Sequence, residues 1–148
     1  MDLKIDPSKI ESEDLGEKST TLKMEHEEAI EYVREVCEEH GFGIPVEFSP
    51  SDLLNKKVGA DKDPYYVLGA CNPEVADQAL DQAIKLGGLF PCNMVIWEEK
   101  PGLQRVYHIS IMSIARLIGI APDNEEWQGI VEKTGEIVDS VFEELEKA

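Results

Sequence analysis

The sequence of 148 residues has few basic side chains and no long hydrophobic run. Lys and Arg number 14 against 31 Asp and Glu, which gives a formal net charge of −17 at pH 7. A field of this sign repels nucleic acid and anionic membrane surfaces. No stretch approaches the roughly 18 apolar residues that a membrane-spanning helix needs. The sequence therefore predicts a protein that binds neither nucleic acid nor a membrane.

Cysteine is also scarce, with only Cys37, Cys71 and Cys92 in the chain. Three cysteines cannot all pair within one chain, and there is no C-x-x-C motif. The first twenty residues are acidic and polar, without the apolar segment of a secretion signal. Because unpaired thiols suit a reducing compartment, we expect a cytoplasmic protein. None of the three histidines has ligand spacing to a cysteine, so no metal site is predicted.

The acidic residues are unevenly distributed along the chain. Residues 21–42 carry 7 acids and 2 bases, and residues 123–148 carry 9 acids and 2 bases. Residues 43–122 are nearly balanced, with 9 acids and 7 bases. Charge runs of this kind usually form solvated helix faces. We expect a flexible acidic arm over residues 1–16 and a single domain over residues 17–148.

The spacing of apolar residues predicts an alternation of strands and helices. A stripe at helical spacing, Ala29 to Cys37, indicates a first helix from Glu25 that ends at Gly41. Asn72 followed by Pro73 is typical of a helix start, and the stripe of that helix runs to Ile84 before Gly87-Gly88. Further helices are expected after Ser49, over residues 114–118, and from Asp123 with Glu126 as a capping pair. The expected strands are residues 18–24, 44–48, 65–71, 94–97 and 104–112.

The predicted fold class is α+β, with the order β-α-β-(α)-β-α-β-β-α and an extra C-terminal amphipathic helix. A single antiparallel or mixed sheet of about five strands would carry its helices on one face. The other face would then have to be buried by another surface. We expect that second face to include Glu47, one of Tyr65 and Tyr66, Trp97 and His108. A homodimer is one way to cover it.

Two short segments both contain a Cys-Asn pair beside a proline: Gly69-Ala70-Cys71-Asn72-Pro73 and Pro91-Cys92-Asn93. Cys71 immediately precedes a helix start, a setting that lowers the pKa of a thiol, so it could be a nucleophile or a soft metal ligand. Alternatively, Cys71 fills a tight corner between strand and helix, and Asn72 only caps the helix. Cys92-Asn93 lies where no helix cap needs Asn, and an ordered polar turn is the alternative there.

The helix after Asn72 is expected to separate the two cysteines. A helix of about 14 residues runs roughly 20 Å away from Cys71. We therefore expect Cys71 and Cys92 at separate corners of one subunit. They would meet only if residues 86–91 return as an extended segment, or across a dimer interface.

The strings EYVREVCEEHGFGIPVEF, GADKDPYYVLGACNP and ALDQAIKLGGLFPCNMVIWEE resemble the domain-of-unknown-function 302 family over roughly residues 18–120. The resemblance implies a small α+β domain, often dimeric, with no settled activity, and it leaves residues 121–148 as a helical extension. The chain departs from the family pattern at Tyr66 and at Met112-Ser113. The positions that resemble the pattern are Glu47, Lys57, Asp61, Tyr65, Cys71, Asn72, Pro73, Cys92 and Asn93.

These observations favour a homodimeric module that binds a small molecule or a partner protein. The first alternative is a thiol- or metal-dependent enzyme with Cys71 as its catalytic residue, an Asn as hydrogen-bond donor, and Glu47 or Lys57 handling protons. The second alternative is an interaction protein whose C-terminal helix docks to a larger assembly. No cofactor is specified. The candidate ligand-binding residues are Cys71, Asn72, Cys92, Asn93, Glu47, Lys57 and Tyr65.

Overall fold

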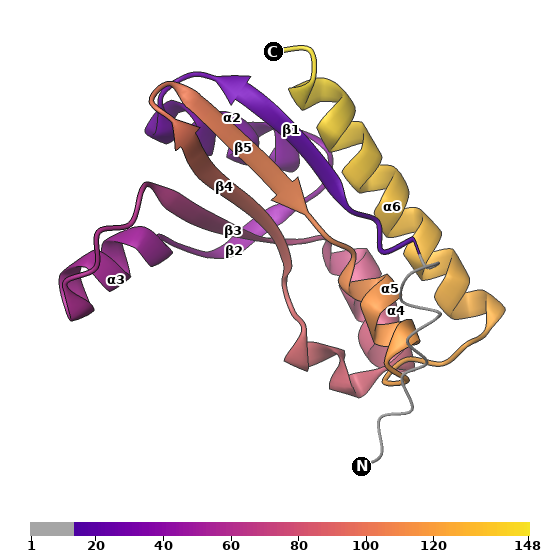
Figure 1. Ribbon diagram of the computed structural model, residues 1–148. Coiled ribbons are helices and arrows are strands. Elements are labelled where there is room, and N and C mark those ends of the chain that lie inside the picture. Colours follow the sequence, from indigo (N-terminus) through magenta and orange to yellow (C-terminus); the bar gives the residue numbers. More distant parts are fainter. Residues whose placement is uncertain (1–13) are drawn as a thin grey trace.

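The computed structural model describes residues 14–148, so most of the arm predicted over residues 1–16 lies outside the described residues. Five strands form one antiparallel sheet in the order β1-β5-β4-β3-β2 (Figure 1). The predicted α+β class, single sheet and order of elements are confirmed. The strands are β1 (Lys18–Lys23), β2 (Gly43–Phe48), β3 (Tyr65–Cys71), β4 (Cys92–Lys100) and β5 (Leu103–His108).

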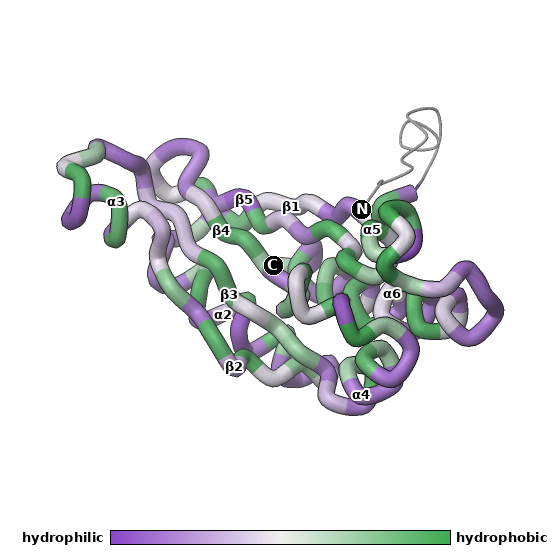
Figure 2. Tube along the Cα trace, turned by 90° about the horizontal axis from the view of Figure 1, so that it is seen from below, coloured by the Kyte–Doolittle hydropathy of each residue, from purple (hydrophilic) through white to green (hydrophobic). Residues whose placement is uncertain are grey.

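The helices gather on one face of the sheet and at one of its ends. Helix α2 contacts the strands from β2 to β5, and α6 packs against β1 and α2. Helices α4 and α5 lie beside α6 at one end, whereas α3 projects from the opposite end (Figure 2). The bounds are α2 (His26–Glu39), α3 (Pro50–Val58), α4 (Pro73–Gln82), the 3-10 helix η1 (Ile84–Gly88), α5 (Ile111–Leu117) and α6 (Glu125–Leu145).

The core has two parts. The first lies between the sheet, α2 and the C-terminal half of α6, and it contains the predicted stripe from Ala29 to Cys37. The second lies among α4, α5 and the start of α6, around the fully buried Trp127. The indole Nε1 of Trp127 donates to the Met112 carbonyl at 3.0 Å, which fixes α6 to α5. No helix of residues 14–148 is both long and apolar enough to cross a membrane.

Side-chain caps place two helix starts differently from the prediction. The fifth strand, expected to reach residue 112, ends at His108 because the Ser110 hydroxyl accepts the Ser113 N–H at 3.1 Å and begins α5. In α6 the cap is Asn124, whose Oδ1 accepts the Trp127 N–H at 2.8 Å. The expected start at Asp123 was therefore wrong by one residue.

The helix after Asn72 is shorter than its apolar stripe indicated. Helix α4 ends at Gln82 because Ala83 adopts φ −146° and ψ 84°, outside the helical region. Residues 84–88 then form η1, which buries Leu86 and leaves Ile84 81% exposed. The placement of Ile84 on the apolar stripe was wrong. This early end brings the chain back toward the sheet.

Strand register decides which side chains face the helices. Glu47 is opposite Leu68, and His108 is opposite Lys18, so both lie on the helix-covered side and their expected place on the other face was wrong. Tyr65 is opposite Trp97 on the uncovered side, as expected. That side, here called the open sheet face, is formed by Val46, Phe48, Tyr65, Val67, Val95, Trp97, Arg105 and Tyr107.

Candidate functional site

The two cysteines expected at separate corners lie at the same end of neighbouring strands. Ala70 pairs with Cys92 between β3 and β4, so Cys71 lies one residue beyond that pair. Cys71 and Cys92 line one cavity of about 10 Å³, room for about one water molecule. The separation predicted from a 14-residue helix was wrong because α4 has 10 residues and the chain returns to the sheet through η1. Cys71, Asn72 and Cys92 are here called the cysteine corner.

The polar groups of the cysteine corner already have structural partners. The Asn72 Oδ1 accepts the Val75 N–H at 3.1 Å, and its amide donates to the Gly41 carbonyl at 3.0 Å, so the predicted cap is present. Burial raises the pKa of the Cys92 thiol to about 12, which keeps it protonated. Cys71 is half-buried. The corner therefore offers at most one accessible thiol.

Close packing on the open sheet face explains the glycine of the first cysteine string. A Cβ at Gly69 would lie 2.6 Å from the Pro91 Cγ and 2.6 Å from the Val46 Cγ2. Real Cβ atoms do not approach that closely, so β2, β3 and the residues before β4 meet here only because the position is glycine. The sheet directly beside the cysteine corner is therefore densely packed.

The remaining predicted site residues lie elsewhere. The Glu47 carboxylate is paired with Arg34 of α2 and accepts the Tyr66 hydroxyl at 2.6 Å. The Arg34 guanidinium, and then the Tyr66 hydroxyl, lower the pKa of Glu47, which makes this carboxylate a poor proton carrier. Lys57 is in the last turn of α3, Tyr65 is at the opposite end of β3 from Cys71, and the Asn93 side chain is exposed. The seven predicted residues thus do not form one site.

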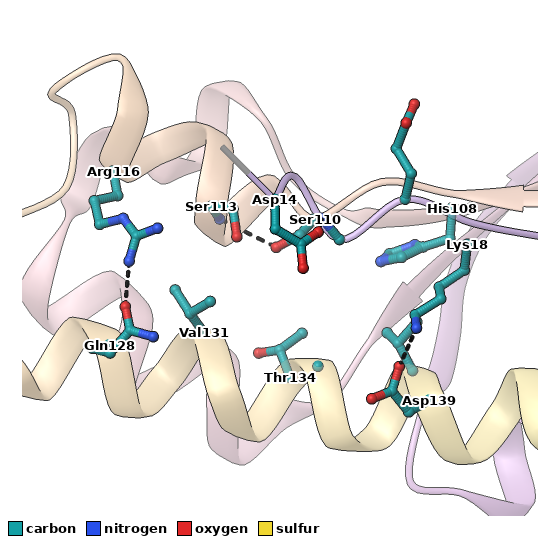
Figure 3. Close-up of a pocket in the computed structure, with 14 residues that line it drawn as sticks. Asp14, Lys18, His108, Ser110, Ser113, Arg116, Gln128, Val131, Thr134 and Asp139 are labelled. Atoms are coloured by element: carbon teal, nitrogen blue, oxygen red, sulfur yellow. Dashed lines mark hydrogen bonds and ion pairs between the residues drawn. The ribbon is translucent and has the colours of Figure 1, made fainter. Parts of the chain in front are cut away.

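A larger cavity, of about 500 Å³, lies between α6, α5, the end of β5 and residues 14–18 (Figure 3). Its lining is mainly polar and comes from four segments that are far apart in the sequence. The sequence analysis identified none of it as a site. The cavity, here called the polar cavity, is lined by Asp14, Glu17, Lys18, His108, Ser110, Ser113, Arg116, Thr134 and Asp139, among others.

His108 presents a hydrogen-bond acceptor to the polar cavity. The residue is 2% exposed, and its Nδ1–H donates to the Asn93 carbonyl at 2.9 Å. Burial lowers the pKa of His108, so the ring is neutral near pH 7 with its lone pair on Nε2. The hydrogen bond of the ring, within residues 14–148, is made by Nδ1, and Nε2 has no partner there. Because every fully buried side-chain nitrogen or oxygen in this range has a partner, Nε2 is not fully buried. The Nε2 atom therefore faces open space, and Figure 3 shows the ring pointing into the cavity.

The position of His108 had a signal in the sequence. Gln104, Val106 and His108 alternate with Arg105 and Tyr107 along β5, and the first three are buried. This period of two places His108 on the same side as Val106. What the sequence does not reveal is that a cavity adjoins the end of that row.

Other groups around the polar cavity are paired. Lys18 Nζ lies 2.8 Å from Asp139 Oδ1 at one end, and Arg116 hydrogen-bonds to Gln128 at the other. The Asp139 carboxylate raises the pKa of Lys18. Among the described residues, no group of three or more His, Cys, Asp or Glu side chains could hold a metal ion. The arrangement is suited to hydrogen bonding of a small polar molecule.

An antiparallel sheet with its helices on one face and a cavity at one end defines a small α+β domain. The model of the family described as domain of unknown function DUF302 matches residues 18–145, so the chain belongs to the DUF302 family. The predicted resemblance is confirmed, and the match extends past residue 120 to include α6.

A solved structure of the same family has a similar fold. It is described as the crystal structure of an uncharacterized conserved DUF302 protein from Bacillus stearothermophilus, with 19% sequence identity and a TM-score of 0.75. The alignment covers 88% of this chain and 98% of that one. At this identity the likeness concerns the fold alone. No curated protein matches the chain.

Proposed function

We propose that this protein is a homodimeric binding module of the cytoplasm that pairs through the open sheet face and holds a small molecule in the polar cavity. The observation that carries the proposal is the division of the domain into two unlike surfaces. One side of the sheet is covered by helices and adjoins the polar cavity. The other side presents aromatic and aliphatic side chains that α2, α4, α5 and α6 leave uncovered and that α3 borders only beside Tyr65 and Trp97, which is typical of an interaction surface.

The open sheet face has the composition of an interface. Tyr65 and Trp97 stack with their ring centroids 6.0 Å apart, and Tyr107 continues the row at 6.2 Å from Trp97. Val46 is 57% and Phe48 52% exposed beside this row. Aromatic residues are enriched at the centres of protein interfaces. Burying this row would remove a large apolar area from water.

Charge favours a second copy of the chain as the occupant of the open sheet face. A molecule with a net charge of −17 repels its copy over most of its surface. The acidic residues are concentrated on α2 and α6, on the other side of the sheet. On the open sheet face, Arg105 hydrogen-bonds to Glu99 and to Ser19, so its charge is locally balanced. Two chains can meet there with little repulsion.

The test is the oligomeric state of the full chain, measured by light scattering after gel filtration. The mass of two chains is expected, and Phe48→Asp should give the mass of one chain because it places a charge in the apolar interface. Ile84→Asp is the matched control, since Ile84 is exposed on η1, away from the open sheet face. A monomeric wild-type protein would contradict the dimer.

The thiol-dependent alternative has less structural support. The proximity of Cys71 to Cys92 favours it, but their shared cavity of about 10 Å³ has no room for a substrate, and the Cys92 thiol is protonated. If the binding module is correct, replacing both residues with serine leaves dimerisation and ligand binding unchanged. Loss of ligand binding in a folded double variant would restore the thiol hypothesis.

A further inference from the structure

Several side chains that line the polar cavity can accept a hydrogen bond from a ligand but have no N–H or O–H left to donate. The Thr134 hydroxyl donates to the Ile130 carbonyl at 2.9 Å, which leaves only lone pairs for a ligand. The His108 ring uses its N–H on Asn93, which leaves the Nε2 lone pair. One oxygen of Asp14 accepts the Gly16 N–H at 2.8 Å, and the second oxygen is left to accept. Three acceptors thus come from three separate segments.

The charges around the cavity also favour a ligand that is positively charged and donates hydrogen bonds. The described lining holds three carboxylates, Asp14, Glu17 and Asp139, against two cationic side chains, Lys18 and Arg116. Asp139 is paired with Lys18, and Glu17 accepts the Tyr107 hydroxyl at 2.6 Å. Asp14 makes no ion pair with any described residue, although its charge helps to raise the pKa of Lys18. The described lining therefore carries one carboxylate more than its cationic side chains.

We propose that the polar cavity binds a small primary alkylamine in its ammonium form, which donates its N–H groups to Asp14, Thr134 and His108. An ammonium group has three donors and no acceptor, and it complements these three acceptors. Figure 3 shows Asp14 and Thr134 on opposite sides of the same space, with His108 pointing in from β5. Val131 and Val138 also line the cavity and provide apolar surface for the alkyl chain. This inference rests on the proposed function, because it names the ligand class of the binding module.

Gly135 keeps space open in the wall formed by α6. It lies within the helix, directly after Thr134, and it lines the cavity. A Cβ at this position would meet no other atom within 4 Å. A larger side chain can therefore enter the cavity without displacing the core. Gly135→Leu is a variant expected to fold and to block the site.

The experiment is a calorimetric titration of the full chain near pH 7 with n-butylamine, 1-butanol and butyrate. These probes share an alkyl chain and differ in the head group. Butylamine should bind saturably with one molecule per chain, and butanol and butyrate at least about tenfold more weakly, because a charge-assisted hydrogen bond is worth about that factor. Butylamine should also shift the NMR signals of the His108 ring. Gly135→Leu should abolish binding while its circular dichroism stays that of the wild type.

A pair of charge variants separates a specific contact from the general field. Asp14→Asn should weaken butylamine binding by about tenfold. Asp77→Asn removes the same charge from an exposed position on α4 and should change the affinity by less than about twofold, because exposed charges are screened. Equal effects of the two variants would overturn the proposal.

Equal binding of butyrate and butylamine, or no saturable binding of butylamine, would also overturn the amine proposal. Light scattering on the same samples distinguishes the two proposals. A dimer that binds no amine removes only the ligand class, whereas a monomer that binds butylamine removes the dimer and leaves the ligand class in place.

Discussion

The cysteine corner and the polar cavity lie on either side of Thr134, which lines both, but they differ in packing and chemistry. The corner contains the residues with the most obvious chemical potential, and it is nearly closed, at about 10 Å³. The polar cavity contains ordinary serine, threonine, aspartate and histidine residues around about 500 Å³. The proposed binding site therefore follows from space and accessible acceptors rather than from reactive residue types.

The largest expected effect comes from a change that should disrupt both regions together. Trp127 of α6 is fully buried against α5, and its Nε1–H donates a hydrogen bond to the Met112 carbonyl. Trp127→Ala should lower the free energy of unfolding by about 3–5 kcal/mol, because it removes a large core side chain and leaves a cavity. Chemical denaturation monitored by circular dichroism measures this loss. A loss below about 1 kcal/mol would mean that the corner and the cavity do not share this support.

Thiol alkylation should distinguish accessible from closed positions in the cysteine corner. A pKa of about 12 leaves roughly one Cys92 thiol in ten thousand ionised near pH 8. Since only the thiolate reacts, iodoacetamide should label Cys92 very slowly, and the labelling rate should rise about tenfold per pH unit between about pH 8 and pH 10 while the fold persists. Peptide mass spectrometry follows each site. Cys37, whose pKa burial also raises to about 12, is the internal control. Rapid labelling of Cys92 near pH 8 would contradict a closed corner.

A pair of glycine substitutions tests the difference in packing directly. At Gly69 a new Cβ would collide with Pro91 and Val46. Gly69→Ala should therefore lower the free energy of unfolding by about 1–3 kcal/mol, the usual cost of overpacking. Urea denaturation at fixed protein concentration checks it. An unchanged midpoint would show that the sheet beside the corner has space for a side chain at this position.

The same substitution beside the polar cavity should have the smallest effect and the opposite sign. Gly135 lies within α6, and a Cβ there meets no atom within 4 Å. Gly135→Ala should raise the free energy of unfolding by about 0.5–1 kcal/mol, because alanine favours the helix over glycine by about that amount. Thermal denaturation should show a slightly higher midpoint. A lower midpoint would indicate that the cavity wall is as tightly packed as the corner.

Much of the fold could be predicted because it depends on local patterns. The stripe from Ala29 to Cys37 is buried as its spacing indicated, and Asn72 caps α4 as Asn-Pro indicated. The errors arose where a neighbouring residue competed. Ser110 rather than the apolar run after it decided where β5 ends, and the extended backbone of Ala83 ended α4 before its stripe did.

The candidate site was less predictable, because it depends on which segments meet. Cys71 and Cys92 were chosen for their chemistry, but their proximity depends on the length of α4 and the return through η1. His108 was visible in the sequence as part of a strand. The role proposed for His108 depends on Asn93, whose carbonyl accepts the Nδ1–H, and on α6, which leaves a cavity in front of Nε2.

The sequence by itself determined the α+β class, the order of elements, most helix starts and the excess of acid on α2 and α6, because hydrophobic period, caps and charge act over a few residues. Only the tertiary structure decided that the cysteine corner closes and that the polar cavity opens. Both outcomes depend on the packing of α4, α5 and α6 against the end of the sheet. That packing joins residues more than one hundred positions apart, such as Asp14 and Thr134, and no local pattern records it.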